Sequence, residues 1–257
     1  ARGTPNEVAE LRVNEDGRID VSVGTHSNGQ GHETTFAQIA ADALGLPIGL
    51  FAFRQGDTDD LDSGGGHGGA RSMHQGGTAV VMAAEGLIEN ARRLAARLLQ
   101  TSVDAVTYEA GMLRVAATGQ EISLEAVAHA SYEQPSDDVA PGLAHRATHL
   151  CDRYTFPNGC HVAEVEIDPD TGDVKLDRYV IFDDFGRLLD PRLTLGQVHG
   201  GVVQGIGQAL LEQALFDPDT GQVLSGSLMD YALPRADDVP SFEGELTQQF
   251  PSKANRL

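Results

Sequence analysis

Three glycine-rich segments constrain this chain more than any other feature of its sequence. They span residues 24–35, 64–72 and 196–208, and in the second segment five of the six residues from Gly64 to Gly69 are glycine. Glycine lets a backbone pass close to a bulky neighbour or adopt a positive φ, but it weakens the interior of a helix or strand. The chain therefore contains long turns that are either ordered by packing or a ligand, or flexible.

The first segment is predicted to open a helix from about Glu33 to Leu44. The turn Gly29-Gln30-Gly31 precedes that helix, and such a turn exposes backbone N–H groups with the helix dipole behind them. The side chain of Gln30 can both donate and accept hydrogen bonds. This pattern suits an anionic or polar ligand. The alternative is an ordinary strand-to-helix turn capped by Ser27 or Asn28.

The other two segments leave the same choice open. Gly64, Gly66 and Gly69 formally match a GxGxxG pattern, but an acidic loop precedes them and no βαβ unit surrounds them, so a dinucleotide-binding fingerprint is not indicated. This segment is either a flexible loop or a close approach to something bulky. In the third segment, glycines weaken a predicted helix by roughly 1 kcal/mol each relative to alanine. Close helix packing or a ligand must offset that loss.

The net charge of −20 excludes nucleic acid and anionic membrane surfaces as favourable partners, because both require a basic face. No apolar run approaches the roughly 20 residues that cross a bilayer. A phosphate-bearing ligand would have to be held mainly by backbone N–H groups. Arg54, Arg71 and Arg187 lie near glycine-rich or turn segments and are the candidate cations.

Cysteine and histidine usage predicts no metal site. Cys151 and Cys160 are too few for a disulfide framework and form no CxxC pair, so we expect two partly buried thiols in the cytoplasm. His26, His32 and His67 lack the spacing of a zinc site. The paired acids Asp183-Asp184 and Asp237-Asp238 are interpreted as solvated turn residues.

The alternation of apolar residues predicts an α+β fold with mixed sheets and long packing helices. Expected strands, helices, a linker and turns follow in order: strands within 9–25, a helix at 33–44, a strand at 50–54, a helix at 72–99, a hairpin at 106–118, a helix at 121–131, a linker at 133–145, strands near 146–156, 160–168 and 173–183, and a helix at 197–215. The two halves are loosely alike, because each is expected to place strands and a Gly-Gln turn before a helix.

The segments together resemble the large subunits of molybdenum hydroxylases, the family of xanthine dehydrogenase, aldehyde oxidase and carbon monoxide dehydrogenase. The resemblance covers nearly the whole chain in the same order. Its motifs are Gly29-Gln30-Gly31-His32-Glu33-Thr34-Thr35, Gly56-Asp57-Thr58-Asp59, Ala70-Arg71-Ser72, residues 155–166, residues 183–187, residues 196–208 and residues 226–236.

The resemblance implies that the chain binds molybdopterin with molybdenum, in the cytosine dinucleotide form, through residues 1–132 and 146–257 as two halves of one cofactor-binding region. No catalytic or metal-ligating residue is assigned within this chain. The implied cofactor-binding residues are Gly29, Gln30, Gly31, His32, Glu33, Thr34, Gly68, Gly69, Ala70, Arg71, Ser72 and Gln197.

The family hydroxylates a carbon centre of an aldehyde, N-heterocycle or CO type substrate with water, and a glutamate serves as the general base. That glutamate follows a Gly-rich stretch shortly after a Pro-Ser, whereas this sequence ends at Pro251-Ser252 and five further residues. We therefore expect a fragment that is inert alone. The expected partners are the remaining large-subunit domains, iron–sulfur and flavin subunits that carry 2Fe-2S and FAD, and a small-molecule substrate.

Two alternatives stay open at this point. Besides the molybdenum enzyme, the first alternative is a non-catalytic domain that packs against partner subunits. The second is a metal-dependent hydrolase that uses His26, His32 and His67. Metal analysis separates the molybdenum enzyme from the hydrolase, because one contains molybdenum and the other zinc or iron. The full-length sequence separates the enzyme from the packing domain: a parent sequence that continues past Leu257 with a Gly-rich stretch and a Glu favours the enzyme.

Overall fold

The computed structural model describes residues 4–133 and 142–253. The chain forms two compact units, which are considered separately below: unit 1 runs to Thr155 and includes the residues from Ser252 onward, and unit 2 is Phe156–Pro251. Most of the predicted linker, residues 134–141, lies outside the described residues. The units divide after Thr155 rather than at residue 146, because the strand that follows the linker pairs with the first strand of the chain.

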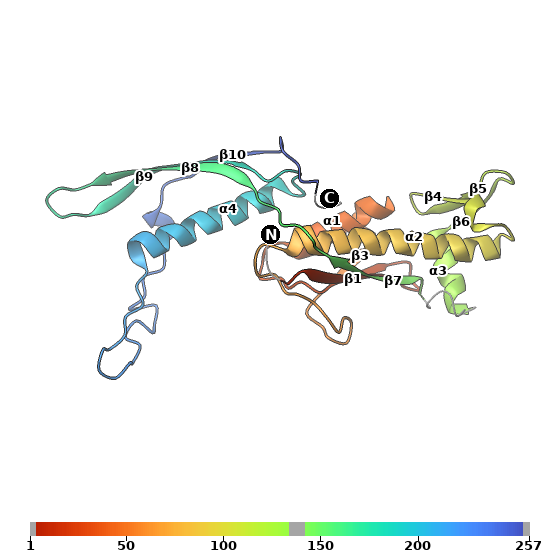
Figure 1. Ribbon diagram of the computed structural model, residues 1–257, viewed down its shortest axis with the longest axis horizontal. Coiled ribbons are helices and arrows are strands. Elements are labelled where there is room, and N and C mark those ends of the chain that lie inside the picture. The colour runs from red at the N-terminus through yellow and green to blue at the C-terminus, as the bar shows by residue number, and fades with distance from the viewer. Residues whose placement is uncertain (1–3, 134–141, 254–257) are drawn as a thin grey trace. The chain divides into compact units, whose positions relative to one another are not determined.

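Unit 1 consists of a mixed sheet covered by helices on one face, together with a small antiparallel sheet (Figure 1). The main sheet has the order β3-β2-β1-β7 and the small one the order β4-β5-β6. The elements are β1 (Asn6–Val13), β2 (Ile19–Val23), α1 (His32–Leu44), β3 (Phe51–Arg54), α2 (Thr78–Leu98), β4 (Val106–Glu109), β5 (Met112–Val115), β6 (Gln120–Ser123), α3 (Leu124–Glu133) and β7 (Ala144–Leu150).

The core of unit 1 lies between the main sheet and α1 and α2. In α2 the apolar residues at intervals of three and four are buried, as their periodicity predicts; Val80, Leu87 and Ala91 are 0% exposed. The matching sheet residues include Leu11 and Val21, also 0% exposed. This packing fixes the ends of β2 and α1, between which the first glycine-rich turn lies.

Unit 2 is a three-stranded sheet with one helix against it (Figure 1). Its elements are β8 (Asn158–Ile167), β9 (Val174–Asp184), α4 (Pro191–Ile206) and β10 (Glu243–Thr247). The small core of unit 2 is formed by Ile181 together with Val202 and Ile206 of α4. A turn of the π type continues α4 from Gly207 to Leu211.

The two units repeat one topology, which confirms the predicted likeness of the halves. In unit 1 the antiparallel pair β1–β2 is followed by α1 and by β3, which lies parallel to β2. In unit 2 the antiparallel pair β8–β9 is followed by α4 and by β10, which lies parallel to β9. The α+β class with mixed sheets is confirmed.

The helix predicted at 197–215 begins earlier and ends earlier. Asp190 caps α4 by accepting hydrogen bonds from Arg192 N and Leu193 N, and Pro191 occupies the first helical position, which proline favours. Gly196-Gln197 therefore lies inside a helix and does not form a turn, so that part of the predicted likeness is wrong. Strand β10 was missed because its sequence, Glu-Gly-Glu-Leu-Thr, has weak strand preference.

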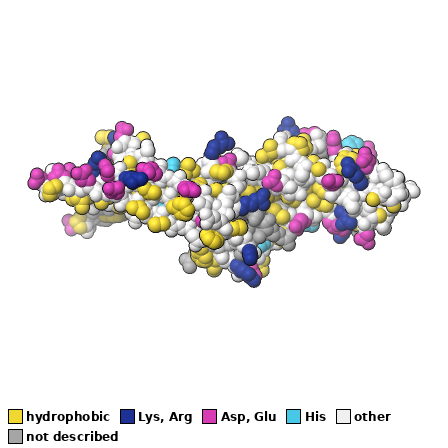
Figure 2. Space-filling view, turned by 90° about the horizontal axis from the view of Figure 1, so that it is seen from above, with side chains coloured by type: hydrophobic (Ala, Val, Ile, Leu, Met, Phe, Trp, Pro, Cys, Tyr) yellow, Lys and Arg dark blue, Asp and Glu magenta, His cyan; other side chains and the backbone are white. Residues whose placement is uncertain are grey.

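Among the described residues, no helix combines the length and the apolar character needed to span a bilayer. On the face that Figure 2 shows, Lys and Arg side chains are scattered among acidic ones and do not gather in a patch. Both cysteines are free; Cys151 is half-buried, but Cys160 is exposed, so the expectation of two partly buried thiols is wrong for Cys160.

Candidate functional site

The first glycine-rich turn joins β2 to α1 and leaves the start of α1 without a side-chain cap. Gly31 occupies the N-cap position with φ 77°, and no side chain hydrogen-bonds there. The alternative cap residues do not serve, because Ser27 Oγ accepts instead from Gly29 N at 3.4 Å. The N–H groups of the first helical turn are therefore open to an acceptor, with the positive end of the helix dipole behind them.

Polar side chains tie this turn together. The Gln30 side chain accepts a hydrogen bond from Asn28 N and donates one to His26 O. The amide of Asn28 lies 3.2 Å from His26 Nδ1 and donates to His67 Nε2 at 2.9 Å. His67 belongs to the second glycine-rich segment, so Asn28 connects the two segments.

Backbone contacts hold the same two segments side by side. The Gly66 N–H donates to the carbonyl of Gly24 at 3.4 Å. A Cβ added to Gly64 would come within 2.1 Å of that carbonyl oxygen. The hydroxyls of Thr25 and Ser72 lie 2.6 Å apart. Two motifs that the sequence shows separately therefore form one surface.

Several residues of the second segment have a left-handed backbone conformation. Gly66, Gly69 and Ala70 have φ values of 66°, 88° and 55°. For alanine this region costs roughly 1–2 kcal/mol, so the surroundings must impose it. A turn of the π type, Ser72–Gly77, follows and leads into α2. The sequence predicted one regular helix from Ser72; π turns are frequent at functional sites.

The glycines of this surface fall into two groups. A Cβ at Gly29, Gly66 or Gly68 would meet nothing within 4 Å, whereas a Cβ at Gly24 or Gly64 would collide with neighbouring atoms. The first group presents bare backbone to open space. These glycines and the uncapped N–H groups of α1 are called the cradle below; they leave backbone open to an extended polar ligand.

Arg71 does not present its charge to this cradle. Its side chain is 0% exposed and forms an ion pair with Glu7, whose side chain is also 0% exposed. Arg54 is engaged as well, in an ion pair of 2.9 Å with Asp20. The expectation that the Arg71 side chain holds a phosphate is therefore wrong, whereas for Arg54, whose side chain is 53% exposed, it stays a prediction. Arg71 reaches the site only through its backbone and through the loop that it holds.

His32, the first residue of α1, is almost completely buried, with 1% of its surface exposed. Its Nδ1 accepts a hydrogen bond of 3.2 Å from Gln55 Nε2, while Nε2 is buried without a partner among the described residues. Burial is the main cause that lowers the pKa of His32. The other predicted residues of α1, Glu33 and Thr34, are exposed.

The three histidines proposed for a hydrolase do not form a metal site. The rings of His26 and His67 lie 6.4 Å apart between centroids, and His32 is buried beneath the turn. Across residues 4–133 and 142–253, no group of three or more His, Cys, Asp and Glu side chains could hold a metal ion. The arrangement gives the hydrolase alternative no support.

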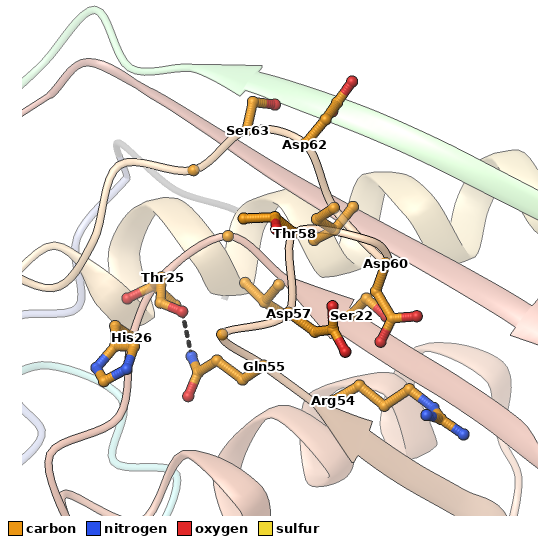
Figure 3. A pocket seen from close by; sticks show the side chains of 15 residues that line it. Ser22, Thr25, His26, Arg54, Gln55, Asp57, Thr58, Asp60, Asp62 and Ser63 are labelled. Carbon is orange, nitrogen blue, oxygen red and sulfur yellow. Dashed lines mark hydrogen bonds between the residues drawn. The ribbon is translucent and has the colours of Figure 1, made fainter.

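A pocket of about 220 Å³ lies beside the turn, between β2 and the loop after β3 (Figure 3). Asp57, Asp60 and Asp62 contribute to its lining, and Gln55 points to the carbonyl of Thr25. An anionic ligand would be repelled by these carboxylates, since the only arginine of the lining, Arg54, is already paired with Asp20. The cradle, not this pocket, suits a phosphate-bearing ligand.

In unit 2 the exposed face of α4 carries only small or amide side chains from its second turn onward. Gln197 lies on this face, and its opposite face packs through Val202 and Ile206. The exposed residues of the face are Gly196, Gln197, Gly200, Gly201, Gln204 and Gly205.

The prediction that Asp183 and Asp184 are solvated turn residues is wrong. They lie at the end of β9 and are 8% and 6% exposed. Asp184 accepts hydrogen bonds from the Thr247 hydroxyl at 2.8 Å and from Gln249 N at 2.7 Å. Asp183 lies 3.0 Å from His161 Nε2. Their partners come from β8, from the end of β10 and from the residues after it, so adjacency in sequence did not reveal them. Asp237-Asp238 is exposed, as predicted.

Comparison with known proteins gives the chain a family. A sequence profile described as the molybdopterin cofactor-binding domain matches residues 1–240. The chain belongs to the molybdopterin cofactor-binding domain family. The resemblance to molybdenum hydroxylase large subunits is thereby confirmed.

Several curated members are similar over nearly the whole chain. The gamma subunit of the 6-hydroxypseudooxynicotine dehydrogenase complex of Paenarthrobacter nicotinovorans is 36% identical over 97% of this chain and 32% of its own length. The carbon monoxide dehydrogenase large chain of Hydrogenophaga pseudoflava is 35% identical over 93% of this chain and 30% of its own length. The chain thus spans about a third of these relatives.

Solved structures of the family share the fold. A Cu,Mo-CO dehydrogenase in the carbon monoxide reduced state superposes with a TM-score of 0.82 and 33% identity over 97% of this chain and 31% of that one. Quinoline 2-oxidoreductase from Pseudomonas putida 86 gives a TM-score of 0.82 and 32% identity over 98% of this chain and 32% of that one.

The residues present fit the cofactor that names the family. Gly29, Gly66 and Gly68 have open space where a Cβ would stand, and the N-terminus of α1 has no side-chain cap. Backbone N–H groups of this kind bind anionic groups without needing a basic side chain. This is the form of site that an acidic chain with a net charge of −20 can offer to a phosphate-bearing pterin.

Proposed function

We propose that the chain forms part of a molybdopterin-dependent oxidoreductase that hydroxylates a carbon centre with water. The observation that carries the proposal is the cradle of Gly29, Gly66 and Gly68, which is formed where two glycine-rich segments are held together. Family membership supports the nature of the ligand. When bound, the molybdenum centre supplies the redox chemistry that transfers oxygen from water to carbon.

The residues of the chain would act by binding and orienting the cofactor. The turn Gly29–Thr34 offers backbone N–H groups at the start of α1, and the loop Gly68–Ser72 offers a second stretch of backbone. Gln197 offers an amide that can donate and accept hydrogen bonds from the face of α4. We assign no catalytic acid or base within this chain, so the base that activates water is expected elsewhere in the protein.

The cytosine dinucleotide form of the cofactor is the finer part of the proposal. A dinucleotide is longer and carries more phosphate than a mononucleotide, so it can use more than one glycine-rich segment. Iron–sulfur and flavin partners with 2Fe-2S and FAD, a small aldehyde, N-heterocycle or CO type substrate, and the cytoplasm complete the proposal. The chain alone is proposed to be inert.

A non-catalytic packing role is the second candidate, and one observation favours it. Unit 2 exposes large apolar side chains: Phe156 is 73%, Leu228 75% and Met229 92% exposed. Exposed apolar surface of this kind marks contacts with other protein parts. It is compatible with both candidates, because a cofactor-binding fragment would also pack against the rest of its enzyme.

Metal and pterin analysis of the parent protein from its native source tests the proposal. The purified protein is analysed for molybdenum, zinc and iron, the pterin is oxidised to its fluorescent form, and the nucleotide is released and identified. Molybdenum with a pterin linked to cytidine monophosphate supports the proposal. A folded parent protein with neither molybdenum nor pterin would leave the packing role.

A further inference from the structure

A buried ion pair lies beneath the second glycine-rich segment. Glu7 is on β1 and Arg71 directly precedes the π turn, 64 positions later in the chain. Both side chains are 0% exposed, and Arg71 Nη1 donates to Glu7 Oε2. An ion pair taken out of water is stable only where further hydrogen bonds satisfy both groups.

Those further hydrogen bonds connect three elements. Arg71 donates to the carbonyls of Gly66 and Asn6, each at 2.6 Å, and to Gln75 Oε1 at 2.6 Å. Glu7 Oε1 accepts from Gly65 N at 3.4 Å. The pair therefore joins the start of β1, the π turn and the backbone of the loop, and both charged groups bind that backbone directly.

The ion pair explains why positions 24 and 65, which do not face the open cradle, are glycine. A Cβ at Gly65 would lie 2.5 Å from the guanidinium carbon of Arg71, and a Cβ at Gly24 would lie 2.5 Å from Glu7 Oε1. The guanidinium has hydrogen-bond partners on several sides, so it cannot easily move away. The ion pair thus requires Gly65, and Glu7 together with the backbone of Ser63 and Gly64 requires Gly24. By contrast, Gly29, Gly66 and Gly68 face open space.

We propose that Glu7 is a positioning residue for the cradle. By pairing with Arg71 it holds residues 64–70 against the turn that precedes α1, and it thereby sets the distance between the two stretches of backbone that receive the cofactor. Arg71 acts through this pair and not through contact with the ligand. This inference rests on the proposed function of the cradle.

The test uses the full-length parent protein with Glu7→Gln, which keeps the size of the side chain and removes its charge. Glu10→Gln is the matched control, because Glu10 lies on the same strand and pairs with Arg146 at 3.1 Å near the surface. Peptide-resolved hydrogen exchange follows the amides of Gly65 and Gly66, and pterin content is measured on the same samples.

For Glu7→Gln we expect exchange in residues 61–72 to accelerate by on the order of tenfold or more and pterin content to fall, while the peptides of α2 exchange much more slowly than the loop over the same times. Glu10→Gln should change neither quantity. Unchanged loop exchange and full pterin content in Glu7→Gln would overturn the inference. If instead the peptides of α2 exchange as fast as those of the loop, the pair is a general structural element and the inference is also overturned.

A second pair of variants keeps the inference testable if Glu7→Gln does not fold. Gly65→Ala leaves both charges in place and pushes only the loop away from Arg71; Gly49→Ala, whose Cβ would meet nothing within 4 Å, is its control. Faster loop exchange and lower pterin content in Gly65→Ala alone support the inference, and identical behaviour of the two variants contradicts it. If the wild-type protein contains no pterin, the proposed function fails, and loop exchange still reports on the ion pair.

Discussion

The hydroxyl groups of Thr25 and Ser72 lie 2.6 Å apart. Thr25 follows β2 in the first glycine-rich segment, and Ser72 is the first residue of the π turn. Thr25 is 1% exposed. A hydrogen bond between two hydroxyls therefore links segments 47 positions apart. This contact is one of the few side-chain links between the two motifs that form the cradle.

Replacing Thr25 with valine should lower the free energy of unfolding by about 1 kcal/mol, because the change keeps the shape of the side chain and leaves the Ser72 hydroxyl unpaired. Thr107→Val is the control, since the Thr107 hydroxyl is exposed and makes only a 3.3 Å hydrogen bond. Urea unfolding of the two variants and the wild type measures the difference. Equal urea midpoints for Thr25→Val and the wild type would show that this hydrogen bond does not contribute to stability.

Glu7→Gln should destabilise unit 1 by roughly 3–5 kcal/mol, because it leaves the buried Arg71 cation without its counter-charge. Glu10→Gln should cost no more than about 1 kcal/mol, since its partners Arg12 and Arg146 are both partly exposed to solvent. Denaturant unfolding with far-ultraviolet circular dichroism compares the two. A similar loss for both variants would show that burial of the Glu7 pair has little energetic effect.

Much of the fold could be predicted from the sequence, because local patterns determine it. The periodicity of α2 and the cap-free glycine turn before α1 depend on neighbouring residues. The early start of α4 was also readable, since Asp190 and Pro191 are a cap and a favoured first position. Strand β10 was not, because its register with β9 depends on packing rather than on its own residues.

The site was predictable as motifs and not as a geometry. The sequence indicated Gly29–Thr34 and Gly68–Ser72 separately, but nothing in it places Gly66 against Gly24. The role of Arg71 was misjudged for the same reason: its partner Glu7 is 64 positions away, and no local pattern marks the pair. An arginine beside glycines invites a ligand interpretation until its burial is known.

The stability of unit 1 should fall as the pH decreases below about 6.5, the ordinary pKa of histidine. Burial lowers the pKa of His32 and of His74 in the folded chain. Well above pH 6.5 neither state is protonated. As the pH falls through about 6.5, the unfolded state binds protons that the folded state does not, so folding is disfavoured. His32→Leu should weaken this dependence between pH 7.5 and 5.5, whereas changing the exposed His129 to Gln should not. Parallel curves for His32→Leu and the wild type would contradict the prediction.

Asp190→Ala should destabilise unit 2 by about 1 kcal/mol, because it removes the cap of α4, whose carboxylate accepts from Arg192 N at 2.9 Å and from Leu193 N at 3.1 Å. Asp177→Ala, in the exposed part of β9, is the control. Thermal unfolding monitored by circular dichroism gives the comparison. If Asp177→Ala and Asp190→Ala have the same melting temperature, the cap does not stabilise unit 2.

The cradle is tested most directly by filling it. In the full-length parent protein, Gly68→Val would project a side chain into the space that the cofactor is proposed to occupy, while Gly49→Val would project one into open space away from the turn and loop; neither added Cβ meets protein atoms within 4 Å. The measurement is the molar ratio of pterin and molybdenum to protein. We expect the ratio to fall sharply in Gly68→Val and to equal the wild-type ratio in Gly49→Val. A folded Gly68→Val protein with the full complement of pterin and molybdenum would contradict the assignment of the cradle as the cofactor site.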